Sequence, residues 1–355
     1  MERSVTSTGT STASATAAPA IVEPTTGHRW LKLLAIVIVL LLIAELFTRL
    51  IDAHLPAPLQ WDTYETQRKV QQIDALAQKG GADMVYVGSS IVDVGIDPAT
   101  VDRQFGGHVT SYNAGLVSSI PRMTTDWTED VVVPKLHPKV VVLGLSSYDL
   151  GAEDPNRTVF LNSYLASSGA RQVMNTNDPI QNVNQWLGQH SALWFHKAQL
   201  RDPATVLHAL EGHTPAQDPE AAAVGPDGRQ TLGQYTKYNP NISVDLQGWR
   251  LGSKDIDAVR QLIAFDSARH ITTVLVDMPV TTQLVDQMPH GESSYRVFTN
   301  EVAAIGSGTH SPVLNDADIR DQALFYSDVH LNHTGAELFS IALGDALKKI
   351  DPDPH

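Results

Sequence analysis

Five short apolar runs, with helical patterns between them, restrict the architecture that this chain can adopt. The runs lie at 84–87, 109–112, 139–143, 271–276 and 312–314. Amphipathic helical patterns lie at 62–79, 254–268 and 293–305, a further helix begins with Ser119 as its cap and Pro121 in its first turn, and Thr334 and Glu337 form a capping box for the last helix. Strands that alternate with helices predict an α/β fold, in which a flavodoxin-like parallel sheet carries helices on both faces.

Polar groups that can perform chemistry follow these strands. Ser90 comes after the first run and Gly115 after the second, and Ser146 follows the third. Asp328 and His330 lie after the last run, before the final helix. The carboxyl ends of parallel strands meet at one edge of a sheet, where such folds bind ligands, so we expect these residues to form a single site.

The stretch from about 151 to 250 interrupts the alternation of strands and helices. It is polar and rich in proline and glycine, with helical pieces near 179–200 and 204–211. We interpret it as an insertion, either a lid or a substrate-binding subdomain. Its aromatic residues form either a sugar-stacking surface or the core of the insertion itself; they are Trp186, Trp194, Tyr235, Tyr238 and Trp249.

The N-terminal part of the chain contains its longest apolar segment. Residues 1–27 are rich in Ser, Thr, Ala and Pro, which predicts a disordered tail. The segment 28–52 contains about 20 mostly apolar residues, enough to cross a bilayer. Arg29 and Lys32 at its start place the N-terminus in the cytoplasm by the positive-inside rule. We predict an uncleaved signal anchor; a cleaved signal peptide and a buried core helix are the alternatives.

Composition excludes several functional classes. The net charge is −14 without a cluster of basic residues, which argues against a nucleic-acid partner. The absence of cysteine excludes disulfides, thiolate metal sites and a cysteine nucleophile. Histidines at 190, 196, 208 and 213 lack tight metal-ligand spacing, so we expect no metal site and no cofactor.

The motifs from 80 to 349, outside the insertion, resemble the SGNH, or GDSL-type, hydrolase superfamily. Gly88-Ser89-Ser90 is similar to the family's Gly-Asp-Ser, which implies Ser90 as nucleophile, and Tyr112-Asn113-Ala114-Gly115 is similar to its second block, which implies Gly115 as an oxyanion donor. The Gly-Ser-Ser form looks like membrane-anchored envelope members, such as the protein of teichoic-acid D-alanylation. The segment 144–147 departs from the third block, so Ser146 or Tyr148 stands where the family has asparagine.

The fourth landmark of the family, Asp-x-x-His, is also altered. Ser327 lies three residues before His330 and Asp328 lies two before it. The Asp-x-His spacing resembles the alginate O-acetyltransferase branch, although there the pair precedes the serine. His330 can take the Ser90 proton, Asp328 can hold the imidazole, and the Ser90 and Gly115 amides with the Ser146 hydroxyl can bind the oxyanion. Simpler roles are a helix cap for Ser90, a structural histidine, a turn carboxylate and a turn glycine.

These patterns predict an extracytoplasmic, membrane-anchored serine esterase or O-acyltransferase, whose domain spans 53–355. Its substrate would be an acyl ester of an envelope glycan or lipid. The alternative is a catalytically impaired protein of the same fold that binds a glycan or a partner in an envelope assembly, because the third block lacks its asparagine and the Asp-His spacing is altered.

Overall fold

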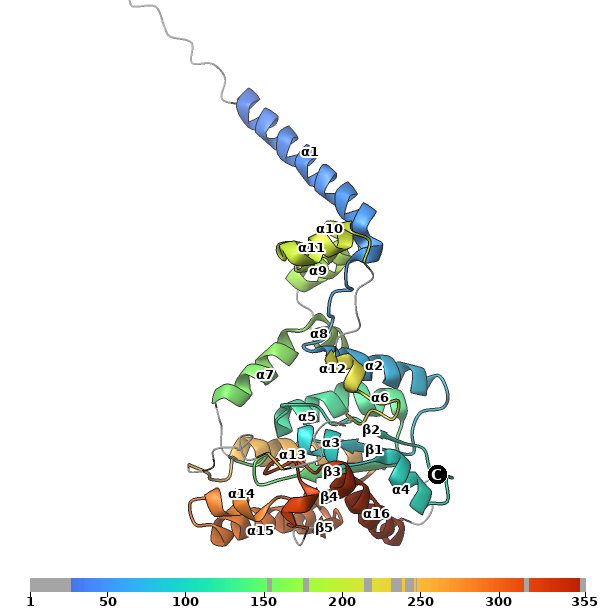
Figure 1. Ribbon diagram of the computed structural model, residues 1–355, viewed down its shortest axis with the longest axis vertical. Helices are drawn as coiled ribbons and strands as arrows, with labels where there is room; N and C mark the ends of the chain where they lie inside the picture. The colour runs from blue at the N-terminus through green and yellow to red at the C-terminus, as the bar shows by residue number, and fades with distance from the viewer. Residues whose placement is uncertain are drawn as a thin grey trace, which may run out of the picture.

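A five-stranded parallel sheet forms the centre of the main domain, with strand order β2-β1-β3-β4-β5 (Figure 1). The computed structural model describes residues 27–151, 155–174, 179–213, 219–230, 238–239, 246, 248–315 and 319–351. The strands are β1 Met84–Val87, β2 Ser111–Asn113, β3 Val140–Leu145, β4 Thr272–Asp277 and β5 Val313–Asn315. This strand order is that of flavodoxin-like folds, so the predicted fold class is confirmed.

Burial on both faces explains why these segments form parallel strands. Every residue of β1 and β3 is buried; β1 is Met-Val-Tyr-Val, and β3 is aliphatic except for Gly144. The register aligns Val85 with Tyr112 on one side and with Val141 on the other, and Val141 with Thr273. Continuous apolar runs of this kind are typical of strands that are covered by helices on both sides.

Two helical layers cover the sheet. In one, α16 (His333–Ile350) packs on α4 (Pro98–Gln104). In the other, α13 (Ser253–Ser267) packs on α5 (Pro121–Trp127) and on α15 (Glu292–Thr309). Connections between parallel strands are right-handed. The connection from β1 to β2 moves across the sheet in one direction and the later connections move in the other, so their helices lie on opposite faces. The remaining helices and helical turns of the domain are α2 Tyr64–Ala77, α3 Ser90–Gly95, the π-turn Thr128–Val132, α6 Val133–Leu136, α14 Thr282–Gln287 and the 3₁₀ turn Gln322–Leu324.

Two helix caps differ from those predicted. Ile120 is the N-cap residue of α5 and makes no side-chain cap, while Ser119 Oγ donates to the Gly88 carbonyl at 3.1 Å. At α16, Asn332 is the N-cap residue and its Oδ1 accepts the Gly335 N–H at 2.9 Å. Asparagine is among the best N-cap residues, which explains why the N-cap of this helix lies two residues before Thr334, the predicted one.

The insertion leaves and rejoins the domain at one place, because Gly151 and Leu251 form an antiparallel bridge. Its helices are α7 Pro155–Ala166, α8 Ser168–Val173, α9 Pro179–His190, α10 Ala192–Phe195, the 3₁₀ turn Gln199–Arg201, α11 Pro203–Leu210 and α12 Pro219–Ala223. Its aromatic residues do not form one surface or one core: Trp186 is exposed, whereas Tyr238 and Trp249 bond to the main domain. Tyr235 lies outside the described residues.

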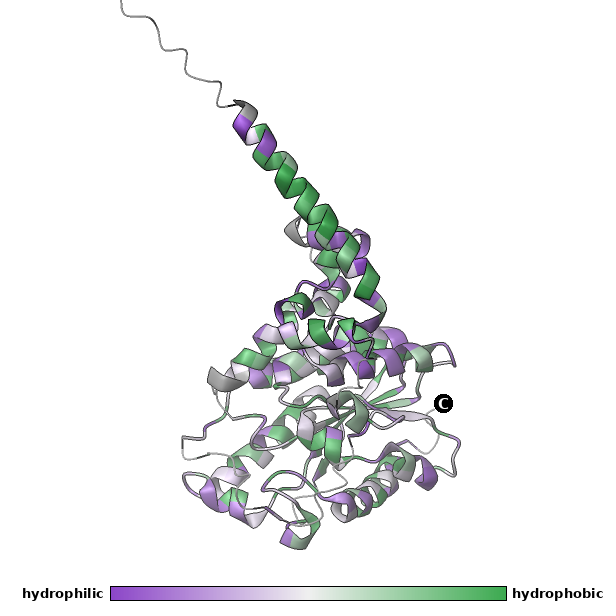
Figure 2. Ribbon diagram, turned by 45° about the horizontal axis from the view of Figure 1, so that its top comes forward, coloured by the Kyte–Doolittle hydropathy of each residue, from purple (hydrophilic) through white to green (hydrophobic). Residues whose placement is uncertain are grey.

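One long apolar helix precedes the domain. Helix α1 (Gly27–Ile51) leads into a 3₁₀ turn at Asp52–His54, and it projects from the rest of the molecule (Figure 2). Most of its large apolar side chains, such as Leu40 and Leu42, are exposed, which is inconsistent with the core-helix alternative. Among the described residues it is the one helix long and apolar enough to cross a membrane. The predicted tail at 1–27 lies outside the described residues except for Gly27.

Candidate active site

A tight turn after β1 presents Ser90 at the carboxyl edge of the sheet. Gly88 directly follows the strand and has a φ of +155°. A Cβ there would lie 2.4 Å from the Val92 side chain and 2.8 Å from the Gly144 carbonyl oxygen. Ser89 then caps α3, with its Oγ accepting the Ile91 N–H. Ser90 is therefore the first residue of α3, where its own N–H has no helical partner.

His330 lies directly against Ser90, although 240 residues separate the two in sequence. Ser90 Oγ is 2.8 Å from His330 Nε2. The imidazole stacks on the Tyr326 ring, with centroids 5.2 Å apart and planes 14° from parallel. Tyr326 and His330 belong to one turn, which a backbone hydrogen bond closes: the Tyr326 N–H donates to the His330 carbonyl at 3.0 Å. This geometry brings a hydroxyl nucleophile and a base within proton-transfer distance.

Ser327 is the partner of the other imidazole nitrogen. Ser327 Oγ is 2.9 Å from His330 Nδ1 and also accepts the His330 backbone N–H at 3.2 Å. A hydroxyl both donates and accepts, so it permits either imidazole tautomer, whereas a carboxylate would require a proton on Nδ1. Burial lowers the pKa of His330 to about 4, which keeps the ring neutral at pH 7 and able to accept a proton.

The structure corrects the predicted role of Asp328. Its Oδ1 accepts a hydrogen bond from the Tyr238 hydroxyl, and its Oδ2 accepts one from Gln287 Nε2 at 3.0 Å. Its backbone carbonyl accepts two bonds from Thr281. Because adjacent residues of this turn point in different directions, Ser327 faces the imidazole while Asp328 joins the insertion and α14 to the turn.

Two of the three predicted oxyanion donors are not available. The Gly115 N–H donates to Asn113 Oδ1 at 3.0 Å, and a Cβ on Gly115 would lie 2.6 Å from the Asp93 nitrogen. Gly115 is thus a packing glycine that lets α3 approach. Ser146 is fully buried, and its N–H and Oγ both donate to Asp149 Oδ2, at 2.9 and 2.7 Å. Neither Gly115 nor Ser146 lines the pocket that contains Ser90.

A pocket of about 290 Å³ opens in front of Ser90 and His330. It is lined by Ser89, Ser90, Val94, Val117, Ser118, Ser119, Tyr148, Phe160, Gln230, Tyr326, Val329 and His330. Ser118 has a φ of +61°, which is unusual for a residue with a side chain. In the described part of the chain, the backbone N–H groups of Ser90 and Ser118 donate to no protein group, whereas those of Val117 and Ser119 do. Two of the residues that line the pocket, Ser90 and Ser118, thus have backbone N–H groups without a partner among the described protein groups.

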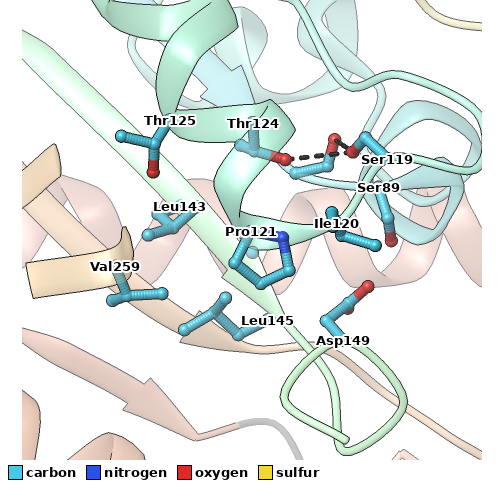
Figure 3. A pocket seen from close by; sticks show the side chains of 12 residues that line it. Ser89, Ser119, Ile120, Pro121, Thr124, Thr125, Leu143, Leu145, Asp149 and Val259 are labelled. Carbon is cyan, nitrogen blue, oxygen red and sulfur yellow. Dashed lines mark hydrogen bonds between the residues drawn. The ribbon is translucent and has the colours of Figure 1, made fainter. Parts of the chain in front are cut away.

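The sequence does not single out Ser118, because no residue pattern predicts a positive φ at a serine. Tyr148, one of the two residues aligned with the family's asparagine, does line the pocket. Ser119 Oγ is 3.0 Å from Thr124 Oγ1 and donates to the Gly88 carbonyl (Figure 3). These bonds hold the segment after Ser118 against the turn that carries Ser90.

A buried ionic cluster supports the loop that carries these donors. Lys69 is fully buried, and its Nζ is 2.5 Å from Asp93 Oδ1 and 3.6 Å from Glu65 Oε1. The same amine donates to the Gly115 carbonyl, and the Glu65 carboxyl accepts the Val117 N–H at 3.3 Å. Burial, with the Asp93 charge beside it, raises the pKa of Glu65 to about 8. The cluster thus fixes the residues that lead to Ser118.

No model of a known protein family matches the chain, and no curated protein matches it. Among solved structures, the chain is similar to a GDSL-like lipase from Bacteroides thetaiotaomicron, with 10% identity and a TM-score of 0.39 over 81% of this chain and 100% of that one. It is similar to a carbohydrate acetylesterase from Sinorhizobium meliloti, with 9% identity and a TM-score of 0.39 over 75% and 99%. It is also similar to an acetylxylan esterase from Geobacillus stearothermophilus, with 12% identity and a TM-score of 0.39 over 78% and 96%. With TM-scores below 0.5, these likenesses leave the chemistry of this chain to be inferred from its own site.

Proposed function

We propose that this chain is a serine esterase of the SGNH type that acts on acyl esters. The observation that carries the proposal is the 2.8 Å contact between Ser90 Oγ and His330 Nε2, both of which line an open pocket. A serine needs a base to become nucleophilic, and a neutral histidine within hydrogen-bond distance is such a base. The ordinary role of a cap does not explain Ser90, since Ser89 supplies the cap of α3.

The reaction follows from the positions of these groups. Ser90 Oγ attacks the ester carbonyl while its proton passes to His330 Nε2, and the N–H groups of Ser90 and Ser118 bind the oxyanion. Collapse of the tetrahedral intermediate breaks the ester C–O bond, and the leaving alcohol takes the proton from His330. A water, or a second alcohol in the case of acyl transfer, then reverses these steps on the acyl-enzyme. The pocket volume suits a small acyl group and its neighbouring atoms.

The location is part of the same proposal. Helix α1 anchors the chain in a membrane and the α/β domain faces away from the cytoplasm, as Arg29 and Lys32 at the start of the helix favour. The substrate class is then an acyl ester of an envelope glycan or lipid. This assignment is supported by the exposed apolar surface of α1 and by the accessible pocket.

Labelling with a fluorophosphonate probe and turnover of p-nitrophenyl acetate test the nucleophile. Purified full-length chain should react with the probe, while Ser90→Ala should lose labelling and turnover. Ser118→Ala is the matched control, because it removes a pocket hydroxyl but keeps the backbone N–H. Unchanged labelling of Ser90→Ala would exclude the proposed nucleophile.

A second function has one observation in its favour. His330 Nδ1 faces Ser327 instead of a carboxylate, which weakens the base and suits a protein that binds an ester, glycan or envelope partner without turning it over. Complementation of cells that require this protein distinguishes catalysis from binding. Rescue by Ser90→Ala would favour binding, and failure of that variant with rescue by Ser118→Ala would favour catalysis.

A further inference from the structure

Three helices of the insertion gather at the end of α1 that is nearer the domain, and we call α9, α10 and α11 the collar (Figure 1). Helix α10 packs on α1, α9 packs on α10, and α11 packs on the 3₁₀ turn that follows α1. The start of α10 sits on Glu45 of α1. The Glu45 carboxylate accepts hydrogen bonds from Ser191 Oγ at 2.7 Å and from the N–H groups of Ala192 and Leu193, each at 3.0 Å. It also pairs with Arg49 at 2.7 Å, so both oxygens have partners.

A second set of contacts joins the collar to the chain just after α1. His196 Nε2 is 2.6 Å from Asp52 Oδ1. Beside this pair, Ile51 and Leu55 pack with Ala209 of α11 in a small apolar cluster of their own. The collar is therefore attached over at least two turns of α1 and cannot be regarded as a separate body.

The positions of these contacts along α1 set the depth of the collar relative to a bilayer. With Lys32 at one boundary, the 20 residues to Asp52 cover about 30 Å at 1.5 Å per residue, which equals the thickness of the hydrocarbon core. Glu45 is 13 residues from Lys32, or about 20 Å. The start of α10 thus lies about 10 Å inside the boundary on the domain side, and any tilt of α1 moves it deeper.

The outer surface of the collar has the composition that such a depth requires. Large apolar side chains of an amphipathic helix are normally buried, yet Trp186 is 57% exposed and Leu207 is 56% exposed. Among the collar side chains that the structure describes, the other large apolar ones that are exposed are Val183, Trp194, Phe195 and Leu210. Lys197 Nζ lies 4.3 Å from the centre of the Trp194 ring, so an ammonium group sits beside an aromatic residue as in interfacial belts.

From these observations we infer that the collar is seated in the bilayer interface, with its exposed tryptophan and aliphatic side chains among the acyl chains. Interfacial helices bury their apolar face by about 5–10 Å, which matches the depth derived from α1. The partner is the lipid bilayer itself. The inference rests on the membrane anchor that is part of the proposed function, and it adds that the insertion is a second membrane contact.

The absence of cysteine allows a direct test by single cysteines that carry a nitroxide label. Leu40→Cys reports the anchor, Val183→Cys and Leu207→Cys report the collar, and Val297→Cys on α15 is the exposed control. All four side chains are exposed, so substitution leaves the core intact. Full-length protein is reconstituted in phosphatidylcholine–phosphatidylglycerol vesicles, and collision of the label with oxygen and with a water-soluble nickel complex is measured.

We expect oxygen to dominate at Leu40, Val183 and Leu207, with the two collar labels shallower than Leu40, and nickel to dominate at Val297. Water exposure of Val183 and Leu207 together with a lipid-buried Leu40 would overturn the inference and leave the anchor in place. Water exposure of Leu40 would refute the anchor and the collar together. Fluorophosphonate labelling of each variant shows separately whether the proposed esterase site is intact.

Discussion

Placing a carboxylate at position 327 should strengthen the base. In the wild-type chain, Ser327 gives His330 Nδ1 a neutral partner that allows both tautomers. An ionised aspartate only accepts hydrogen bonds, so Ser327→Asp should fix the proton on Nδ1 and leave Nε2 free to accept the Ser90 proton. Ser327→Asn is the matched control, since it has the same size and no charge.

The size of the effect follows from the site. Burial lowers the pKa of His330 from 6.5 to about 4, and at 1.36 kcal/mol per pKa unit this disfavours the imidazolium by about 3 kcal/mol. Hydrogen bonds to charged groups exceed neutral ones by about 1–1.5 kcal/mol. We therefore expect Ser327→Asp to raise kcat/KM about tenfold over Ser327→Asn, because 1.36 kcal/mol corresponds to a factor of ten.

The assay is hydrolysis of p-nitrophenyl acetate across a pH range. The kinetic pKa of the base should rise by about one unit in Ser327→Asp, since the same interaction stabilises the imidazolium. Ser327 is fully buried, so both variants should lose some stability, and thermal unfolding shows whether they lose it equally. Equal kcat/KM in the two folded variants, or an unchanged kinetic pKa, would refute the reasoning.

Three further predictions concern the surroundings of the nucleophile. Because burial lowers the pKa of His330 to about 4, kcat/KM of the wild-type chain should stay level from pH 8 to pH 6 and fall as the pH drops through about 4; a fall centred near 6.5 would contradict this. Lys69→Met leaves the Asp93 carboxylate buried without its partner and should reduce the free energy of unfolding by about 3–5 kcal/mol in chemical denaturation. Lys69→Arg keeps the positive charge and should reduce it by less. Gly88→Ala places a Cβ 2.4 Å from the Val92 side chain at a φ of +155°, so it should cost at least about 1–3 kcal/mol by the same measurement and lower probe labelling of the folded fraction.

Much of the fold could be predicted from the sequence because burial leaves a clear pattern. The apolar run at 139–143 corresponds to β3 at Val140–Leu145, and 84–87 matches β1. The strand at 109–112 was shifted, since polar Ser111 and Asn113 are buried there through side-chain bonds that hydropathy does not record. Short helices such as α3 and α4 were missed because they contain too few residues to show a period.

The site could be predicted only to the level of which segments meet. The order of the strands brings Ser90 and the turn of His330 to one edge, and the structure places the two side chains in contact. The choice between Ser327 and Asp328 depends on which way adjacent side chains point within one turn. The choice between Gly115 and Ser118 depends on a backbone dihedral. Neither quantity follows from apolar periodicity or from residue type.

The bonds of Asp328 have a mechanical consequence. Tyr238, at the end of the insertion, donates to Asp328, and the Asn239 N–H donates to the Tyr326 carbonyl at 2.7 Å. These two bonds hold Tyr326 and Asp328, the residues on either side of Ser327. Displacement of Tyr238 and Asn239 would therefore break these bonds or move the turn that carries the imidazole.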